Sequence, residues 1–336
     1  MGVLRGLVAF ALLLSVVAGL GACGGGSDGE TIDLSAAKPR ELTEAASFDG
    51  VHSGELEVAL EIDRYKKHPE EINLRILGPF MKVGEGKLPA IDMAVESRGD
   101  LGGKAVEFLS GPLLRPEKVA INFEGKVYEP DQATFEELKS KLEDTLGEGG
   151  EGDATACPKA AGEFDLAQVL RNVSSEGKSE TLDGEPMKVV GADLDVSAAI
   201  DELVRLSEDP ACKAQLEAVG VPPVAQLEAL TALLERSRAT PRVTLGVDEN
   251  GVVRYLEVLG KVGLQGNEEL EVELVVRLNK VNEVTELAEA QGSSPFRALL
   301  KRFGLTSEDI KEADGGEILV GVLEVLSDRM FGRETG

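Results

Sequence analysis

The sequence contains no tryptophan, only two histidines and three cysteines, and few aromatic residues, ten phenylalanines and three tyrosines among 336 residues. Basic residues are also scarce, since 35 Lys and Arg face 61 Asp and Glu and leave a net charge of −26. Few histidines and cysteines leave few ligands for zinc, and an acidic surface repels nucleic-acid phosphates. We therefore expect no metal, no cofactor and no nucleic-acid partner. The hydrophobic fraction of 42% is enough for a buried core.

The N-terminus has the pattern of a secretory signal. One positive charge, Arg5, precedes an apolar run from Gly6 to Ala18, which is too short and too lightly flanked for a comfortable membrane span. The run ends in Leu20-Gly21-Ala22-Cys23, which resembles the bacterial lipobox, and a glycine-rich stretch follows. We predict that residues 1–22 are a lipoprotein signal peptide and that Cys23 is acylated. Two or more acyl chains anchor a protein stably to a bilayer, so the predicted location is extracytoplasmic, on the cell membrane.

The other two cysteines form an even pair. In an oxidising compartment Cys157 and Cys212 are predicted to form a disulfide, which would close a 55-residue loop. Such a loop contributes roughly 4 kcal/mol in the chain-entropy model. A reactive thiol pair is the rival interpretation, but it lacks the Cys-x-x-Cys spacing of redox sites.

Apolar residues alternate with polar ones over much of the chain, which indicates strands with one wet face. The strands are expected near 55–62, 72–76, 91–95, 119–123, 177–182, 186–193, 243–247, 252–258 and 269–281. Loop signals are expected to separate the first runs, at His68-Pro69, 84–86, 99–103 and Gly111-Pro112. Helical spacing predicts helices at 131–146, 165–172, 196–207, 222–238, 295–303 and 317–331. Strands and helices in separate blocks favour an α+β fold with an antiparallel sheet that helices cover.

Several short segments of the sequence resemble those of a known family. They are Ile76–Phe80, Gly86–Met93, Val119–Glu129, Gly184–Val196, the hairpin at 243–258 and the strand at 269–281. Together they resemble an actinobacterial group of extracytoplasmic lipoproteins related to the LolA and LolB carriers and to the LppX and LprG lipid-transport lipoproteins. The resemblance implies an incompletely closed antiparallel β-barrel, a half-barrel around helices, with an apolar cavity for acyl chains.

The resemblance also sets the expected domain organisation. A lipidated Cys23 and flexible tether (23–44) lead into a LolA-like lipid-binding domain (45–283), and a helical extension (284–336) follows. The expected cavity-lining residues are Leu56, Val58, Leu60, Leu74, Ile76, Ile91, Val95, Ile121 and Phe123. The same apolar strand faces would equally line a solid core packed against the helices.

The sequence contains no recognisable set of catalytic residues, so we expect that the protein is not an enzyme. Asp49, His52 and Ser53 lie too close in sequence, without a nucleophile elbow, to form a hydrolase triad. The leading hypothesis is a membrane-anchored lipoprotein that binds or carries a lipid, glycolipid or other amphiphile. The alternative is a structural or protein-interaction envelope lipoprotein with a filled core, whose partner docks on the C-terminal helices.

Overall fold

The strands of this chain assemble into one broad sheet. The computed structural model describes residues 32–48, 50–65, 70–82, 90–101, 104–115, 118–123, 125–132, 135–136, 166–182, 184–209, 224, 241–263, 269–287, 293–296 and 298–299. The strands are β1 (Ser53–Tyr65), β2 (Glu70–Met81), β3 (Ala90–Asp92), β4 (Ala94–Leu101), β5 (Lys104–Arg115), β6 (Lys118–Phe123), β7 (Lys126–Glu129), β8 (Leu170–Leu182), β9 (Glu185–Leu194), β10 (Arg242–Asp248), β11 (Val253–Gly263), β12 (Glu269–Asn279) and β13 (Ser293–Pro295). The helices are α2 (Pro39–Ala45), α5 (Leu166–Val169) and α6 (Val196–Glu208).

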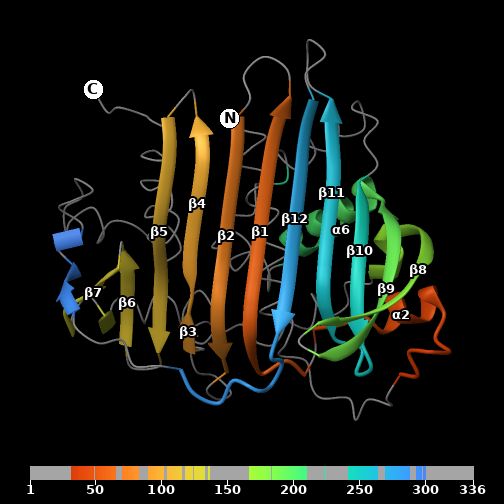
Figure 1. Cartoon of the computed structure of the whole chain (residues 1–336), viewed down its shortest axis with the longest axis horizontal. Coiled ribbons are helices and arrows are strands. Elements are labelled where there is room, and N and C mark those ends of the chain that lie inside the picture. Colours follow the sequence, from red (N-terminus) through yellow and green to blue (C-terminus); the bar gives the residue numbers. More distant parts are fainter. Residues whose placement is uncertain are drawn as a thin grey trace.

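Within the described residues the thirteen strands follow the order β13-β7-β6-β5-β3-β2-β1-β12-β11-β10-β9-β8, and β4 pairs with β2 and β5. Every pair is antiparallel except the short parallel contact between β13 and β7. The two edge strands of this order, β13 and β8, do not pair with each other, so the sheet is open. Figure 1 shows the long strands side by side, with β8 and β9 turned across one edge. The predicted antiparallel sheet that does not close is confirmed.

Alternation along each strand separates a wet face from an apolar face. In β1 the side chains of Val58, Leu60 and Ile62 are buried, whereas Glu61 is exposed. Successive residues of a strand point to opposite faces, so this pattern fixes which side of the sheet carries the core. The pairing of Val58 with Val276 and of Leu60 with Leu274 continues the same face into β12.

The helices cover the apolar face at one end of the sheet. Leu42 of α2, Val169 of α5 and Ala199 of α6 belong to the same buried cluster as Leu245 and Leu274. Figure 1 places α2 and α6 beside β8–β12. The carboxylate of Asp195 caps α6 by accepting a hydrogen bond from the Ala198 N–H at 3.0 Å. The predicted helix at 196–207 is thereby confirmed.

Several predicted boundaries are wrong. The strand expected near 91–95 is divided between β3 and β4, and the loop expected at 99–103 begins only after Leu101, the last residue of β4. The helix expected at 165–172 ends at Val169, because β8 begins at Leu170 and pairs there with Leu194. The loop expected at Gly111-Pro112 is part of β5. Pro112 lacks a backbone donor, and the register places it beside the break between β3 and β4 on one side and opposite Ile121 of β6 on the other.

The predicted helices at 131–146, 222–238, 295–303 and 317–331 fall largely or wholly on residues that the structure does not describe. Of their described residues, 132, 135, 136, 224, 296, 298 and 299 are helical, whereas Asp131 is not and Pro295 belongs to β13. Three strands were not predicted. The strands β7 and β13 are too short to show a clear period of two, and β5 contains the Gly111-Pro112 pair that indicated a loop.

Candidate functional site

The central feature of the fold is a continuous apolar row across the sheet. Directly opposed residues of antiparallel strands point to the same face, so the register identifies the row. From β9 to β4 it consists of Val190, Leu245, Leu256, Val276, Val58, Ile76 and Val95. A second row lies beside it and consists of Ala192, Val243, Val258, Leu274, Leu60 and Leu74. These rows form one apolar face, which is the candidate binding surface.

Burial along this face falls from one side of the sheet to the other. Near the helices Leu245 is 1% exposed and Val276 is 3% exposed. Leu74 and Ile76 of β2 are only partly buried, although they pack against the same cluster. The described helices therefore leave apolar side chains of the β2 region partly accessible.

The strand register places all nine predicted cavity-lining positions on this one face, and that they line a cavity stays a prediction. Val58 and Leu60 belong to the buried cluster, and Leu56, Leu74 and Ile76 pack against it. Ile91 and Ile121 are partly buried and Phe123 is buried. Val95 pairs with Ile76, but its side chain is among those that the structure does not describe.

A pocket with a volume of about 320 Å³ lies between α5 and α6, beside the apolar core. It is lined by Gln168, Val169, Arg171, Ala198 and Glu202. Val169 is part of the buried cluster and Ala198 packs against it, while Arg171 and Gln168 supply polar groups. Arg171 Nη2 lies 3.1 Å from the Asp195 carboxylate, and Nη1 donates to the Gln168 carbonyl at 2.8 Å. Sequence reasoning missed this pocket, because its two helices bring together residues about thirty positions apart.

The opposite face of the sheet is charged. Glu57 lies 2.8 Å from Arg75 and 3.4 Å from Arg277, and the Arg277 guanidinium lies 5.7 Å from the ring centre of Tyr255. Glu61 is directly opposite Glu273. This face is in contact with solvent and carries ion pairs, as the alternating pattern predicts.

The pKa of Glu273 on the charged face is raised above its usual value. Burial of the carboxyl is the largest cause, and the nearby charges of Glu257, Glu61 and Glu271 add to it. Arg277 acts in the opposite direction but does not cancel these effects. Like charges opposed across strands are destabilising, so this part of the sheet carries a local cost in stability.

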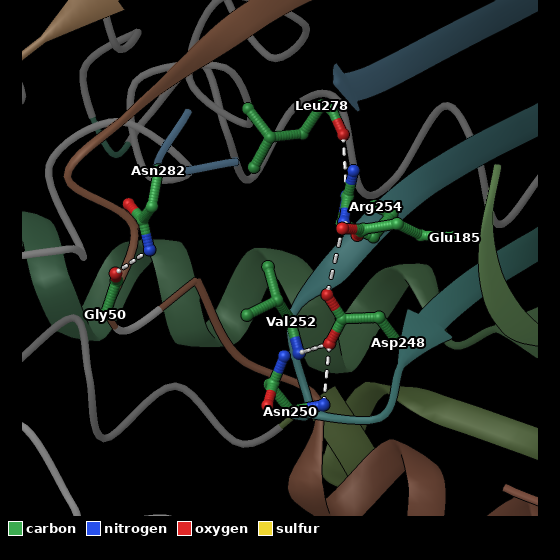
Figure 2. A network of polar contacts seen from close by, with 8 residues as sticks. All are labelled: Gly50, Glu185, Asp248, Asn250, Val252, Arg254, Leu278 and Asn282. Atoms are coloured by element: carbon green, nitrogen blue, oxygen red, sulfur yellow. Dashed lines mark hydrogen bonds and ion pairs between the residues drawn. The ribbon is translucent and has the colours of Figure 1, made fainter. Parts of the chain in front are cut away.

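A buried polar network closes the β10–β11 hairpin (Figure 2). Arg254 Nε donates to the Leu278 carbonyl at 2.8 Å, and its Nη1 contacts the carboxylates of Asp248 and Glu185. Asp248 Oδ1 accepts from the backbone N–H groups of Asn250 at 2.8 Å and Val252 at 3.0 Å. The sequence reveals the turn at 248–251, but it contains no signal that Arg254 would be buried with Asp248.

The remaining sequence candidates lie apart from these features. Cys23, Cys157, Cys212 and Asp49 fall outside the described residues. His52 and Ser53 are described, and their backbone N–H groups donate to the Asn282 side chain. Within the described ranges no group of three His, Cys, Asp or Glu residues could hold a metal ion. In the same part of the chain, a helix with the length and apolar character needed to span a bilayer is absent.

Comparison with known proteins gives distant structural matches only. No family model matches the sequence, and no curated protein matches it. LprF from Mycobacterium bovis is similar in structure at 10% identity, with 76% of this chain and 94% of that chain covered and a TM-score of 0.29. A LolA superfamily protein from Nitrosomonas europaea is similar at 8% identity, with 73% of this chain and 94% of that chain covered and a TM-score of 0.17. TM-scores this low do not establish a family, and the functional proposal rests on the geometry of this chain.

Proposed function

We propose that this protein is an extracytoplasmic lipoprotein, anchored to the cell membrane through acylated Cys23, that binds the apolar part of a lipid or other amphiphile without catalysis. The cargo would lie against the apolar face near β2, where Leu74 and Ile76 are partly accessible. The observation that carries the proposal is the fall in burial along one uninterrupted apolar face, from Leu245 to Ile76.

Simple transfer energetics support this proposal. Each Å² of apolar surface removed from water stabilises a complex by about 25 cal/mol, so a partly buried acyl chain gains useful affinity. The described part of the face offers aliphatic side chains, which suit acyl chains.

The alternative function is a structural or protein-interaction lipoprotein of the cell envelope. In that case the whole apolar face would be filled by the protein's own side chains. The buried cluster around Val58 and Leu60 shows that part of the face is already packed in this way. The two functions therefore differ in what covers Leu74 and Ile76.

The test is native mass spectrometry of the full acylated chain, expressed in a bacterial host and released from detergent, with solvent extraction in parallel. A carrier should retain a discrete non-covalent adduct that extracts as lipid. A mass equal to the acylated chain alone, with no uptake of added phospholipid, contradicts lipid binding and favours the alternative. The covalent mass added to the Cys23 peptide tests the anchor separately.

A further inference from the structure

The first apolar row across the sheet continues beyond β4. The register leads from Val95 through Ser110 of β5 and Phe123 of β6 to Lys126 of β7. Directly opposed residues of antiparallel strands lie on the same face, so Lys126 lies on the face that carries the row. Figure 1 shows β7, β6, β5, β4 and β2 following one another across the sheet. The row therefore begins at a buried aliphatic residue, Val190, and ends at a lysine.

An aromatic ring lies beneath the charged end of this lysine. Lys126 is exposed, and its Nζ lies 5.3 Å from the ring centre of Tyr128. Tyr128 is 3% exposed and pairs with Ile121, so its ring belongs to the apolar face. A lysine can lay its methylene stem along such a ring while its ammonium stays in water. Lys126 thus places a cation at the rim of an apolar surface.

The charge of Lys126 is open to a ligand. Among the described residues, no carboxylate pairs with this lysine. Glu129, close to it in β7, lies on the opposite face and pairs with Lys118. By contrast Lys188, at the other side of the sheet near the helices, donates to the Ala37 carbonyl at 2.6 Å. Within the described part of the chain, Lys126 therefore keeps its positive charge for an anion.

We propose that Lys126 binds the anionic headgroup, a phosphate or a carboxylate, of an amphiphile whose acyl chain lies on the apolar row toward Ile76; this rests on the lipid binding proposed above. An ammonium in contact with an oxyanion forms a charge-assisted hydrogen bond. The acyl chain leaves water against Phe123 and its neighbours. A molecule with only one of these two parts gains only one of the two contributions.

The width of this part of the sheet suits one acyl chain. Between β7 and β2 lie β6, β5 and β4, so four strand spacings of about 4.8 Å give roughly 19 Å. An acyl chain occupies about half of a hydrocarbon core that is about 30 Å thick, which is roughly 15 Å. A chain that starts at Lys126 therefore covers Phe123 and ends close to Ile76, where the face is partly accessible.

The negative net charge of the protein acts only weakly at this position. Glu57 and Glu61 lie on the charged face, on β1, which is one strand further from β7 than β2 is. Glu273 lies on the same charged face of β12, further away again. At physiological ionic strength, exposed charges more than about 8 Å apart are largely screened. An oxyanion in contact with Lys126 therefore gains more from this lysine than it loses to those acids.

Competition between two amphiphiles with the same chain tests the proposal. The full acylated chain is mixed with equal concentrations of dodecyl phosphate and dodecyl maltoside, and native mass spectrometry measures the ratio of the two adducts. Lys126→Gln should lower the ratio of phosphate to maltoside adduct about three- to fivefold, which is the size of an exposed ion pair. Lys126→Arg should not lower it, because the positive charge remains.

Lys261→Gln provides the matched control. Lys261 is also exposed, but it lies on the charged face and pairs with Glu271 at 3.1 Å. Its substitution removes the same charge and should leave the adduct ratio unchanged, and thermal unfolding checks that each variant is folded. An equal fall in both variants, or an unchanged ratio in Lys126→Gln, overturns the headgroup site alone. Binding of neither amphiphile by the parent chain overturns lipid binding as well.

Inorganic phosphate separates a lipid headgroup from a free anion. The apolar row should make dodecyl phosphate bind more tightly than inorganic phosphate, because only the former removes an acyl chain from water. An equal concentration of inorganic phosphate should therefore leave the dodecyl phosphate adduct in place. Displacement at equal concentration would mean that Lys126 takes a free anion, and it would overturn the assignment to a lipid.

Discussion

Arg254 and Asp248 form a buried ion pair at the end of the β10–β11 hairpin, with Nη1 3.4 Å from Oδ2 and side chains 3% and 5% exposed. Asp248 also binds two backbone N–H groups of the turn, and Arg254 binds the Leu278 carbonyl of β12. The pair therefore joins the turn to the neighbouring strand from inside the fold.

Removing one partner of this pair should be strongly destabilising. We expect Arg254→Ala to lower the free energy of unfolding by about 3–5 kcal/mol, because it leaves Asp248 buried without its counter-charge. Arg75→Ala, which breaks an ion pair on the charged face, should cost only about 0–1 kcal/mol. Urea unfolding of both variants measures the difference, and equal losses would show that the buried pair has no special role.

Gly251 should be indispensable for the contact with the N-terminal segment (residues 32–48). Its φ is 78°, and a Cβ there would lie 2.8 Å from the Ala45 carbonyl oxygen. Gly184 has a similar φ of 86°, but a Cβ there meets nothing within 4 Å. Gly184→Ala therefore bears only the backbone strain, about 1 kcal/mol, and Gly251→Ala should cost about 1–3 kcal/mol.

Hydrogen exchange distinguishes the two glycine variants in a second way. Gly251→Ala should speed exchange of the Ser47 and Val253 amides, which bind across the contact, whereas Gly184→Ala should leave them protected. Unchanged protection in Gly251→Ala would mean that the N-terminal segment does not depend on this close approach.

Glu273 should make stability depend on pH. Because burial and neighbouring acids raise its pKa above the usual 4.5, its favourable contribution to folding is fully present below pH 4.5. That contribution is lost as the pH rises through the raised pKa. We expect Glu273→Gln to stabilise the protein at pH 7 by about 0.2–1 kcal/mol, with a gain that vanishes at low pH.

A second substitution on the charged face serves as the control for this pH effect. Glu57→Gln removes a carboxylate that is paired with Arg75 and Arg277, so it should not stabilise at pH 7. Unfolding free energies measured from pH 4 to pH 8 test the contrast. A stabilising Glu57→Gln would indicate that net charge, rather than local repulsion at Glu273, governs stability.

Neighbouring residues of the apolar row should respond differently to a bulky substitution. Val58 is 4% exposed within the buried cluster, whereas its partner Ile76 is partly accessible. Val58→Trp should therefore destabilise by about 1–3 kcal/mol or more through overpacking. Ile76→Trp should lower lipid adducts in native mass spectra with a smaller loss of stability.

This pair of variants also separates the two candidate functions. If Ile76→Trp destabilises as much as Val58→Trp and no lipid is bound by the parent chain, the apolar face is a filled core. The structural or interaction lipoprotein would then be the better interpretation.

The sequence alone identified most of the long strands and their faces, because a period of two places Val58, Leu60 and Ile62 on one side whatever they pair with. It did not identify β5, β7 or β13. It also located the β10–β11 turn, which depends on local backbone chemistry, and the helix at 196–207, which its apolar spacing indicates. It misjudged Pro112, whose place within β5 depends on the break between β3 and β4 beside it.

Tertiary structure decided the remainder. Only the fold pairs β1 with β12, more than two hundred residues away, and so joins two amphipathic strands into one apolar face. Only the fold buries Arg254 beside Asp248 and binds the N-terminal segment to the turn. A period in sequence determines which way a side chain points, whereas its partners depend on contacts between segments that no local pattern specifies.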